Sequence, residues 1–250
     1  MALLIDIGNT RIKWARFEGG TLQPQSAAPH ADWSVATFVA TVLRADRADH
    51  VLVSNVAGTR MADVVRTGVA QTWQGEAKFV ASTPLAGGIR NAYPQPAKLG
   101  VDRWLAMIGA HALERGAVCV VSVGTAMTID GIAADGLHLG GVIVPGPDLM
   151  VTSLLKNTSD IAERARQGDT SDGLFADNTL GAIRQGSEHA LAALIERAVG
   201  VMRRTLHETP TLLVTGGASD RVEQAIGLPY RVVPDLVLQG LAVLAAEPRR

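Results

Sequence analysis

The feature that most constrains the fold is a short pattern that occurs twice in the chain. In each copy an apolar, strand-like run ends in a glycine, followed by hydroxyl or amide residues and a second strand-like run. The copies are residues 3–10 and residues 120–128. Each half also contains a later strand that runs into a polar turn, at residues 51–55 and 212–217. The repetition predicts an internal duplication, and therefore two lobes with a cleft between them.

The secondary structure expected around this pattern is of mixed α/β type. Runs of β-branched apolar residues predict strands at 2–7, 51–56, 118–123 and 212–215. Helical periodicity predicts helices at 34–44, 60–72, 101–115, 182–205 and 220–226. Strands and helices that alternate at this spacing indicate an α/β architecture. We expect a boundary near Gly116, between an N-terminal domain of residues 1–116 and a C-terminal domain of residues 117–250.

Composition and charge argue against several classes of function. The 23 basic and 24 acidic residues leave a formal net charge of -1, so no basic surplus indicates nucleic-acid binding. The apolar runs are shorter than the roughly 20 residues that span a bilayer, and the N-terminus lacks the basic region of a signal peptide. The single cysteine, Cys119, excludes a disulfide framework. We expect a cytoplasmic protein that binds neither nucleic acid nor membrane.

The first glycine turn has the composition of a phosphate-binding loop. Gly8 permits unusual backbone dihedral angles, and Asn9 and Thr10 add hydrogen-bond donors without bulk. Asp6, just before the turn, is placed where a carboxylate could hold Mg²⁺ beside bound phosphates. An ordinary β-hairpin would use the same residues, so the turn alone leaves both interpretations open.

The second glycine turn, together with a later glycine pair, strengthens the phosphate interpretation. The amides of Gly124 and Thr125 could bind the other side of the same polyphosphate. The sequence Thr-Gly-Gly-Ala-Ser at 215–219 ends a strand and opens a helix, where a flat nucleobase and ribose could approach the backbone. Each element alone could be a common turn, but the three in this order are more specific. The residues expected to contact the polyphosphate are Asp6, Ile7, Gly8, Asn9, Thr10, Arg11, Lys13, Gly124 and Thr125.

These three elements resemble the two phosphate motifs and the adenosine motif of the actin/hexokinase/Hsp70-like ATPases. More narrowly, residues 6–10, 100–103, 140–146 and 178–179 together resemble the type III pantothenate kinases, over essentially the whole chain. The resemblance implies two duplicated ribonuclease H-like (actin-like ATPase) domains. It also implies ATP-dependent phosphorylation of pantothenate to 4′-phosphopantothenate, the first step of coenzyme A biosynthesis, with ATP and Mg²⁺ as cofactors.

The segment Gly-Val-Asp-Arg at 100–103 contains the candidate catalytic group. Asp102 lies near an expected helix start, where a carboxylate is also typical of a plain N-cap. As a general base, Asp102 would take the proton from the attacking hydroxyl of the substrate. Its neighbour Arg103 offers a planar fork that matches a carboxylate. In the family this motif lines the pantothenate site, which implies substrate contacts for Gly100, Val101, Asp102 and Arg103.

Two further substrate contacts are implied by the resemblance. Tyr93 would line the pantothenate pocket, although a proline-flanked surface aromatic is the plain alternative. Thr179 is expected to be the N-cap of the long helix and, by resemblance, to contact pantothenate bound to a neighbouring subunit. The resemblance therefore implies a homodimer.

The chain departs from the family pattern at Ser122. Many members have aspartate two residues before the glycine of the second phosphate motif, associated with a monovalent cation such as K⁺ or NH₄⁺. A hydroxyl is a weaker cation ligand than a carboxylate, so the sequence leaves dependence on such a cation open.

Two alternative functions fit the same sequence. One is a kinase of the same fold that acts on another hydroxylated small molecule, and the other is a non-catalytic regulatory accessory protein. The presence of Asp6, Asp102, Arg103 and Thr179 argues against a protein that has lost catalysis. The six histidines are scattered without metal-ligand spacing, and we assign none of them a role.

Overall fold

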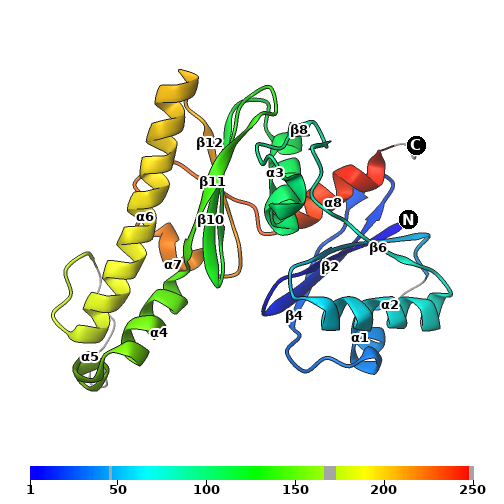
Figure 1. Ribbon diagram of the computed structural model, residues 1–250, viewed down its shortest axis with the longest axis horizontal. Helices are drawn as coiled ribbons and strands as arrows, with labels where there is room; N and C mark the ends of the chain where they lie inside the picture. Colours follow the sequence, from blue (N-terminus) through cyan, green and yellow to red (C-terminus); the bar gives the residue numbers. More distant parts are fainter. Residues whose placement is uncertain (45–46, 166–172, 248–250) are drawn as a thin grey trace. The chain divides into compact units, whose positions relative to one another are not determined.

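The computed structural model describes residues 1–44, 47–165 and 173–247 (Figure 1). The chain forms two compact units. Unit 1 comprises Met1–Arg115, Gly136–His138 and Asp235–Arg250, and unit 2 comprises Gly116–Asp135 and Leu139–Pro234. Among the described residues, no helix is both long enough and apolar enough to cross a membrane.

Unit 1 is built on a mixed sheet with the strand order β3-β2-β1-β5-β6, in which β4 also pairs with β2. Strand β1 is antiparallel to β2 and parallel to β5. The strands are β1 (Ala2–Ile7), β2 (Arg11–Glu18), β3 (Thr21–Leu22), β4 (Ser26–Pro29), β5 (His50–Asn55) and β6 (Ala77–Phe79). The remaining elements are α1 (Val35–Val42), α2 (Thr59–Trp73), β7 (Leu85–Ala86), β8 (Ile89–Arg90), the 3-10 helix η1 (Pro96–Lys98), α3 (Val101–Leu113) and α8 (Leu236–Ala246).

The two faces of the unit 1 sheet are covered by different helix pairs. Successive side chains of β1 point to opposite faces, so they pack against different helices. Leu3 and Ile5 belong to a buried cluster with residues of α1 and α2. Leu4 belongs to a second cluster, with Leu105 of α3 and residues of α8. Figure 1 shows these helix pairs on opposite sides of the sheet. By the same alternation, Asp6 lies on the face covered by α3 and α8.

Helix α8 joins unit 1 through a close crossing with α3. A Cβ atom at Gly109 would collide with the carbonyl oxygen of Leu236, and one at Gly240 would collide with that of Leu105. Glycine at both positions therefore allows the two helix backbones to touch. The sequence patterns did not predict α8, and the predicted N-terminal domain of residues 1–116 ends before it. The domain boundary near Gly116 stays a prediction.

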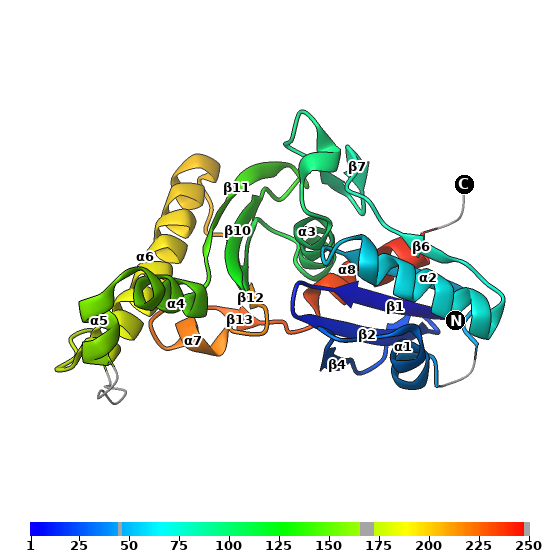
Figure 2. The same ribbon diagram turned by 60° about the horizontal axis from the view of Figure 1, so that its bottom comes forward.

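Unit 2 is built on a second mixed sheet, with the order β11-β10-β9-β12-β13. Its strands are β9 (Val118–Val123), β10 (Ala126–Ile132), β11 (His138–Pro145), β12 (Thr211–Thr215) and β13 (Arg231–Val232). Its helices are α4 (Pro147–Asn157), α5 (Ser159–Arg164), α6 (Thr179–Leu206) and α7 (Asp220–Glu223). The buried side of α6 packs on the odd-numbered residues Cys119, Val121 and Val123 of β9. Both views show α6 running beside the sheet of unit 2 (Figures 1 and 2).

The two sheets share one topology, which confirms the predicted duplication. Taken in chain order within each unit, the main strands are arranged third, second, first, fourth and fifth. The antiparallel pair β1/β2 corresponds to β9/β10, and the parallel pair β1/β5 corresponds to β9/β12. In this correspondence Asp6 of β1 matches Ser122 of β9, and each lies two residues before the glycine of its turn.

Candidate active site

Asp6 is a buried carboxylate near the carboxyl end of the central strand of unit 1. Its side chain is 8% exposed, and its Oδ1 atom has no hydrogen-bond partner among the described residues. In the sheet register, Asp6 lies opposite Lys13 of β2 on one side and Ser54 of β5 on the other. Directly paired residues project from the same face of a sheet, so a cation and a hydroxyl flank this carboxylate.

Burial raises the pKa of Asp6 to about 6, since the charged form loses its hydration. The neighbouring Ser54 and the positive charge of Lys13 both lower this pKa, but by less than burial raises it. The negative charge of Asp102 adds to the increase. Asp6 and Asp102 therefore lie close enough to interact electrostatically, as expected from the position of Asp6 on the α3 face of the sheet.

Asp102 lies in the first turn of α3, with its side chain half-buried. Gly100 is the N-cap of this helix, so the alternative that Asp102 is a plain N-cap is wrong. The Oδ1 atom of Asp102 instead accepts the N–H of Arg103 at 2.9 Å. The partial positive charge of a helix N-terminus stabilises an ionised carboxylate. Asp102 thus places its carboxylate at the N-terminus of α3, where the helix dipole favours negative charge.

Arg103 and Tyr93 form a polar cluster next to this carboxylate. The Nη1 of Arg103 donates to the phenolic oxygen of Tyr93 at 3.1 Å, and the Arg103 side chain is 6% exposed. Asn91 supports the segment, because its Oδ1 accepts the Tyr93 N–H at 2.9 Å. The imidazole of His138 stacks on the Tyr93 ring, with centroids 6.2 Å apart and planes 8° apart. Tyr93 is therefore held beside Arg103 and is not an isolated surface aromatic.

The first glycine turn presents unsatisfied backbone donors. The Gly8 N–H donates to the Arg11 carbonyl at 3.0 Å and closes the turn. The N–H groups of Asn9 and Thr10 have no acceptor among the described residues, and both residues are exposed. Arg11 is exposed at the start of β2, whereas Lys13 lies beside Asp6. Adjacent N–H groups without acceptors, near a cation, are suited to binding an anion.

The second glycine turn is tightly packed within unit 2. The Gly124 N–H donates to the Ala126 carbonyl at 3.0 Å, and Thr125 at the tip is exposed. The Gly146 N–H donates to the Thr125 carbonyl at 2.9 Å. A Cβ atom at Gly146 would collide with the carbonyl oxygen of Gly124. Gly146, which opens α4, thus lies in direct contact with the turn.

The late glycine pair, Gly216 and Gly217, belongs to a turn that contacts the end of β9, the strand that leads into the second glycine turn. Gly216 has a φ of +105°, and a Cβ atom there would collide with the Val123 carbonyl oxygen. The Ala218 N–H donates to that oxygen at 3.1 Å. The elements assigned to phosphate and adenosine binding in the second half are therefore neighbours in unit 2.

Ser122 is the central member of a row of hydroxyl groups across the unit 2 sheet. It pairs with Thr128 of β10 on one side and with Thr215 of β12 on the other. Because paired residues share a face, the three hydroxyls lie on the face away from α6. The position that matches the Asp6 carboxylate in unit 1 thus has neutral oxygen atoms as neighbours.

Thr179 is the first residue of α6 and not its N-cap, so that expectation is wrong. The N-cap is Asn178, whose Oδ1 accepts the Gly181 N–H at 2.8 Å. Asparagine is a better capping residue than threonine, which explains the difference of one position. The Thr179 hydroxyl makes no hydrogen bond with the described residues. It remains available for another partner.

The geometry of unit 1 fits a divalent cation held mainly by bound phosphates and water. Within the part of the chain that the structure describes, no group of three or more His, Cys, Asp or Glu could hold a metal ion. The unpartnered Oδ1 of Asp6 is a hard oxygen ligand of the kind that Mg²⁺ prefers, and Mg²⁺ in phosphoryl-transfer sites often uses only one or two carboxylates.

Comparison with known proteins identifies the family. A family model described as type III pantothenate kinase matches residues 2–200. The type III pantothenate kinase of Nitrosococcus oceani is 35% identical over 253 residues, which cover 99% of this chain and 94% of that protein. The chain belongs to the type III pantothenate kinase family. A member from Aromatoleum aromaticum is 40% identical over 251 residues, covering 99% and 98% of the two chains.

A solved structure supports the fold of this family member. An activator of 2-hydroxyisocaproyl-CoA dehydratase from Clostridium difficile, solved with bound ADPNP, aligns with a TM-score of 0.56 at 12% identity. The alignment covers 98% of this chain and 93% of that protein. The predicted resemblance to the type III pantothenate kinases and the predicted actin-like ATPase fold are both confirmed. The roles of individual site residues stay predictions.

Two histidines near the candidate site of this pantothenate kinase family member were not predicted from the sequence. His138 stacks on Tyr93, and its Nδ1 accepts the Ala92 N–H at 3.4 Å. His30 contacts the first glycine turn, with its Nε2 atom 2.6 Å from the Gly8 carbonyl oxygen. Both are buried, yet neither belongs to a motif or has a spacing that would identify it. Only the fold brings them to the site.

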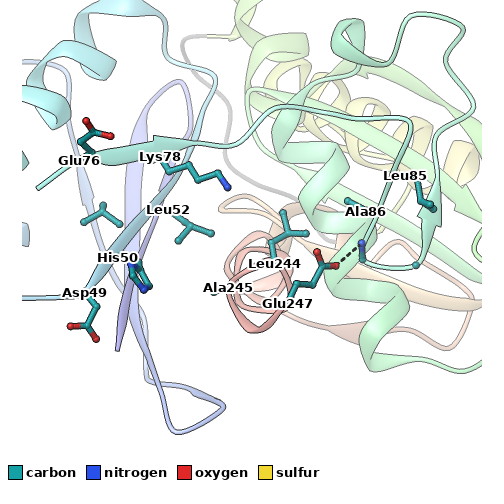
Figure 3. Close-up of a pocket in the computed structure, with 13 residues that line it drawn as sticks. Asp49, His50, Leu52, Glu76, Lys78, Leu85, Ala86, Leu244, Ala245 and Glu247 are labelled. Atoms are coloured by element: carbon teal, nitrogen blue, oxygen red, sulfur yellow. Dashed lines mark hydrogen bonds between the residues drawn. The ribbon is translucent and has the colours of Figure 1, made fainter. Parts of the chain in front are cut away.

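A cavity elsewhere in unit 1 contains none of the predicted site residues. Its volume is about 1110 Å³, and it lies beside the first residues of β5 and β6 and the end of α8 (Figure 3). At its wall the Glu247 carboxylate accepts the Gly87 N–H at 3.2 Å. In the sheet register Ser54 is paired with Asp6, and His50 lies four residues before Ser54 on β5. At the rise of a β-strand, His50 is therefore about 13 Å along the sheet from Asp6. The cavity is thus at the opposite end of the strands from the glycine turn.

Proposed function

We propose that this chain transfers the γ-phosphoryl group of ATP to the primary hydroxyl of pantothenate and produces 4′-phosphopantothenate. Membership of the type III pantothenate kinase family supports the substrate and the reaction. The observation that carries the proposal is the placement of Asp6, Asp102 and a turn with unsatisfied N–H groups within unit 1. As the first step of coenzyme A biosynthesis, the reaction would take place in the cytoplasm.

The two glycine turns would bind the phosphates of ATP. In the first turn the N–H groups of Asn9 and Thr10 would donate to phosphate oxygens, and Lys13 and Arg11 would add positive charge. In the second turn, Gly124 and Thr125 would likewise contact phosphate oxygens. Donors fixed by a packed turn need no reorganisation as charge shifts during the reaction, and phosphoryl transfer depends mainly on such positioning.

Asp6 would hold Mg²⁺ beside these phosphates. When bound, the metal ion would neutralise negative charge on the β- and γ-phosphates. The nearby positive charge of Lys13 and the hydroxyl of Ser54 favour the ionised form of Asp6 that binding requires. Burial works against that form, so Asp6 is best suited to a state in which a cation occupies its unpartnered oxygen.

Asp102 would act as the general base. Its carboxylate would accept the proton of the pantothenate hydroxyl while the hydroxyl oxygen forms a bond to the γ-phosphorus. The bond from that phosphorus to the β,γ-bridging oxygen would break, and ADP would leave with the bonding electrons. Positioned general bases typically contribute about 10²- to 10⁴-fold to a rate.

Arg103 and Tyr93 would bind the carboxylate end of pantothenate. A guanidinium group pairs with a carboxylate through two parallel hydrogen bonds, and the buried position of Arg103 would strengthen that pairing. The hydrogen bond to Tyr93 would hold the guanidinium in place. Gly100 and Val101 would line the same pocket at the start of α3.

A product analysis tests the proposed reaction. The purified protein would be incubated with MgATP and pantothenate, and the product examined by ³¹P NMR and mass spectrometry. A phosphate monoester on the primary hydroxyl of pantothenate is expected. A panel of other hydroxylated acids, run in parallel, distinguishes pantothenate from the acceptors of related kinases. Phosphorylation of another acceptor at a much higher kcat/KM would refute the substrate assignment.

We also propose that the protein is a homodimer in which Thr179 reaches the substrate of the partner. Thr179 lines an apolar groove of about 670 Å³ between α4 and α6, with Met150, Leu154 and Ile183. Phe175, a few residues before α6, is 92% exposed. Large exposed aromatic side chains beside an apolar groove are typical of a protein interface. A second copy of the chain is the occupant that would give Thr179 a substrate to contact.

Mixing two inactive variants tests this arrangement. A mixed dimer of Asp102→Asn and Thr179→Ala subunits would contain one intact site if Thr179 acts on the partner's substrate. Random mixing would then restore about a quarter of wild-type activity in a symmetric dimer. If Thr179 acts within its own subunit, each site in the mixed dimer carries one substitution. Mixtures no more active than the separate variants would therefore refute the shared site.

Finally, we propose that catalysis does not require K⁺ or NH₄⁺. The row of hydroxyls formed by Thr128, Ser122 and Thr215 offers no negative charge to a monovalent cation. Activity in Na⁺ buffer close to that in K⁺ buffer is the expected result.

A further inference from the structure

His30 is a buried histidine in contact with the proposed phosphate-binding turn. It follows β4, and its side chain is 3% exposed. Its Nε2 atom lies 2.6 Å from the carbonyl oxygen of Gly8. A carbonyl oxygen can only accept a hydrogen bond, so Nε2 must be the protonated nitrogen. The other ring nitrogen, Nδ1, is buried and has no partner among the described residues.

This hydrogen bond determines the direction of one of the unsatisfied N–H groups. The Gly8 carbonyl and the Asn9 N–H belong to the same peptide group. In a planar trans peptide these two groups point in opposite directions. Because the carbonyl points at His30, the Asn9 N–H points away from His30 and out of the turn. No described residue accepts that N–H.

The position of His30 is itself fixed by its surroundings. The backbone N–H of His30 donates to the Thr10 carbonyl at 3.4 Å, whereas its ring contacts the Gly8 carbonyl. His30 therefore contacts the turn at two places. Arg60 of α2 donates to the carbonyl of Ala31 at 2.7 Å and to that of Trp33 at 3.2 Å. The segment that follows His30 is thus attached to a helix of the unit 1 core.

We infer that His30 is a positioning residue that aims the Asn9 N–H at a phosphate oxygen of the nucleotide. The inference rests on the proposed function, since it requires the turn to bind ATP. His30 would touch neither substrate, and its effect would pass through the Gly8–Asn9 peptide. Without the histidine donor, this peptide could rotate and its N–H would lose a fixed direction.

A matched pair of variants distinguishes the effect of the hydrogen-bond donor at position 30 from the effect of the side chain's shape. Glutamine and methionine are similar in size and shape, but only glutamine can donate a hydrogen bond to Gly8. We expect His30→Met to weaken MgATP binding, measured by calorimetry, about tenfold, the value of one typical hydrogen bond. His30→Gln should stay within about threefold of wild type, because the donor that positions the turn is retained. The KM for pantothenate should change little in either variant.

The outcomes distinguish the inference from the proposed function. Equal MgATP affinity of wild type and a folded His30→Met variant would overturn the role of His30 and leave the kinase proposal intact. Equal weakening by both substitutions would also overturn it, since the donor would then not matter. A wild type that binds no MgATP would overturn both. The wild-type protein gives an independent readout, because the Asn9 amide proton should shift downfield in NMR spectra when MgATP binds; an unmoved Asn9 signal with ATP bound would contradict the inference.

Discussion

Arg103 donates a hydrogen bond across 3.1 Å to the phenolic oxygen of Tyr93, and the guanidinium carbon lies 5.9 Å from the centre of the Tyr93 ring. This contact joins the start of α3 to a segment ten residues earlier in the chain. Arg103 belongs to α3, and the Tyr93 N–H is bound by the Asn91 side chain. The guanidinium therefore has a defined orientation before substrate binds. Preorganisation of this kind lowers the entropy that binding must overcome.

Replacing Arg103 by lysine is expected to raise the KM for pantothenate about tenfold or more, with a smaller change in kcat. Lysine keeps the positive charge but loses the planar fork that pairs with a carboxylate. Steady-state kinetics with pantothenate and with pantothenyl alcohol, in which a hydroxyl replaces the carboxylate, would measure the effect. The wild type should prefer pantothenate strongly, and the variant should lose most of that preference.

Tyr93→Phe is the matched control for this experiment, since it removes one hydroxyl and keeps the ring that stacks on His138. Its effect on KM should be smaller than that of Arg103→Lys. An unchanged preference for pantothenate in the Arg103 variant would show that another group recognises the carboxylate.

Replacing Asp102 by asparagine is expected to lower kcat by about 10² or more and to leave MgATP affinity near that of wild type. Asparagine preserves the shape and can still accept the Arg103 N–H, but it cannot take up the substrate proton. An ADP-release assay would give kcat, and calorimetry would give the affinity for MgATP. A variant with near-wild-type kcat would rule out Asp102 as the base.

The sequence was sufficient to predict the fold because the duplicated pattern is local. The strands at 2–7 and 118–123 match β1 and β9 residue for residue, since each is a run of mostly apolar residues, with one polar residue near its end, that leads into a turn. The helix predicted at 182–205 is α6, which begins earlier, at Thr179. In contrast, α8 is apolar around most of its circumference, and its place against α3 depends on Gly109 and Gly240, which lie far apart in the sequence.

The candidate site was predictable only where its residues form contiguous motifs. Asp6, Gly8 and Asp102 stand in such motifs, and the alternation along β1 explains why the two carboxylates interact. His30 and His138 reach the site through tertiary packing, and isolated histidines give no sequence signal. The cap of α6 was misplaced by one residue because Asn178 and Thr179 are both capping residue types.

Asp6→Asn is expected to stabilise the ligand-free protein at neutral pH while it removes the proposed Mg²⁺ ligand. The pKa of Asp6 is about 6 in the folded state, against 3.8 for the ordinary group. The folded state therefore binds more protons between these values, and the contribution of Asp6 to stability falls as the pH rises from about 4 to about 6. The variant should be more stable than wild type by up to about 3 kcal/mol at pH 7, with little difference near pH 4.

Urea unfolding of both proteins between pH 4 and pH 8, without nucleotide or metal, measures this difference. Asp63→Asn is a suitable control, since Asp63 is an exposed carboxylate on the outer side of α2 and its side chain is 70% exposed. The control should show no comparable pH-dependent gain. If the difference in the free energy of unfolding between Asp6→Asn and wild type stayed constant over this pH range, the interpretation of Asp6 as a carboxylate destabilised by burial would be refuted.

Ser122→Asp is expected to make activity depend on K⁺. The substitution places a negative charge between the hydroxyls of Thr128 and Thr215, where oxygen ligands for a cation already lie. Without a cation, the partly buried charge would disfavour the second glycine turn. ADP release in K⁺ and in Na⁺ buffers should be similar for wild type and differ for the variant. Strong K⁺ stimulation of the wild type would refute the proposal that the neutral hydroxyls have removed this dependence.

The most direct test of the central claim is the rate of ADP release from MgATP by the purified protein, with and without pantothenate. The pantothenate kinase proposal predicts slow release alone and a large, saturable stimulation when pantothenate is added. Release that pantothenate does not change, in K⁺ as well as in Na⁺ buffer, would contradict the claim. The function would then lie with another acceptor or with a regulatory role.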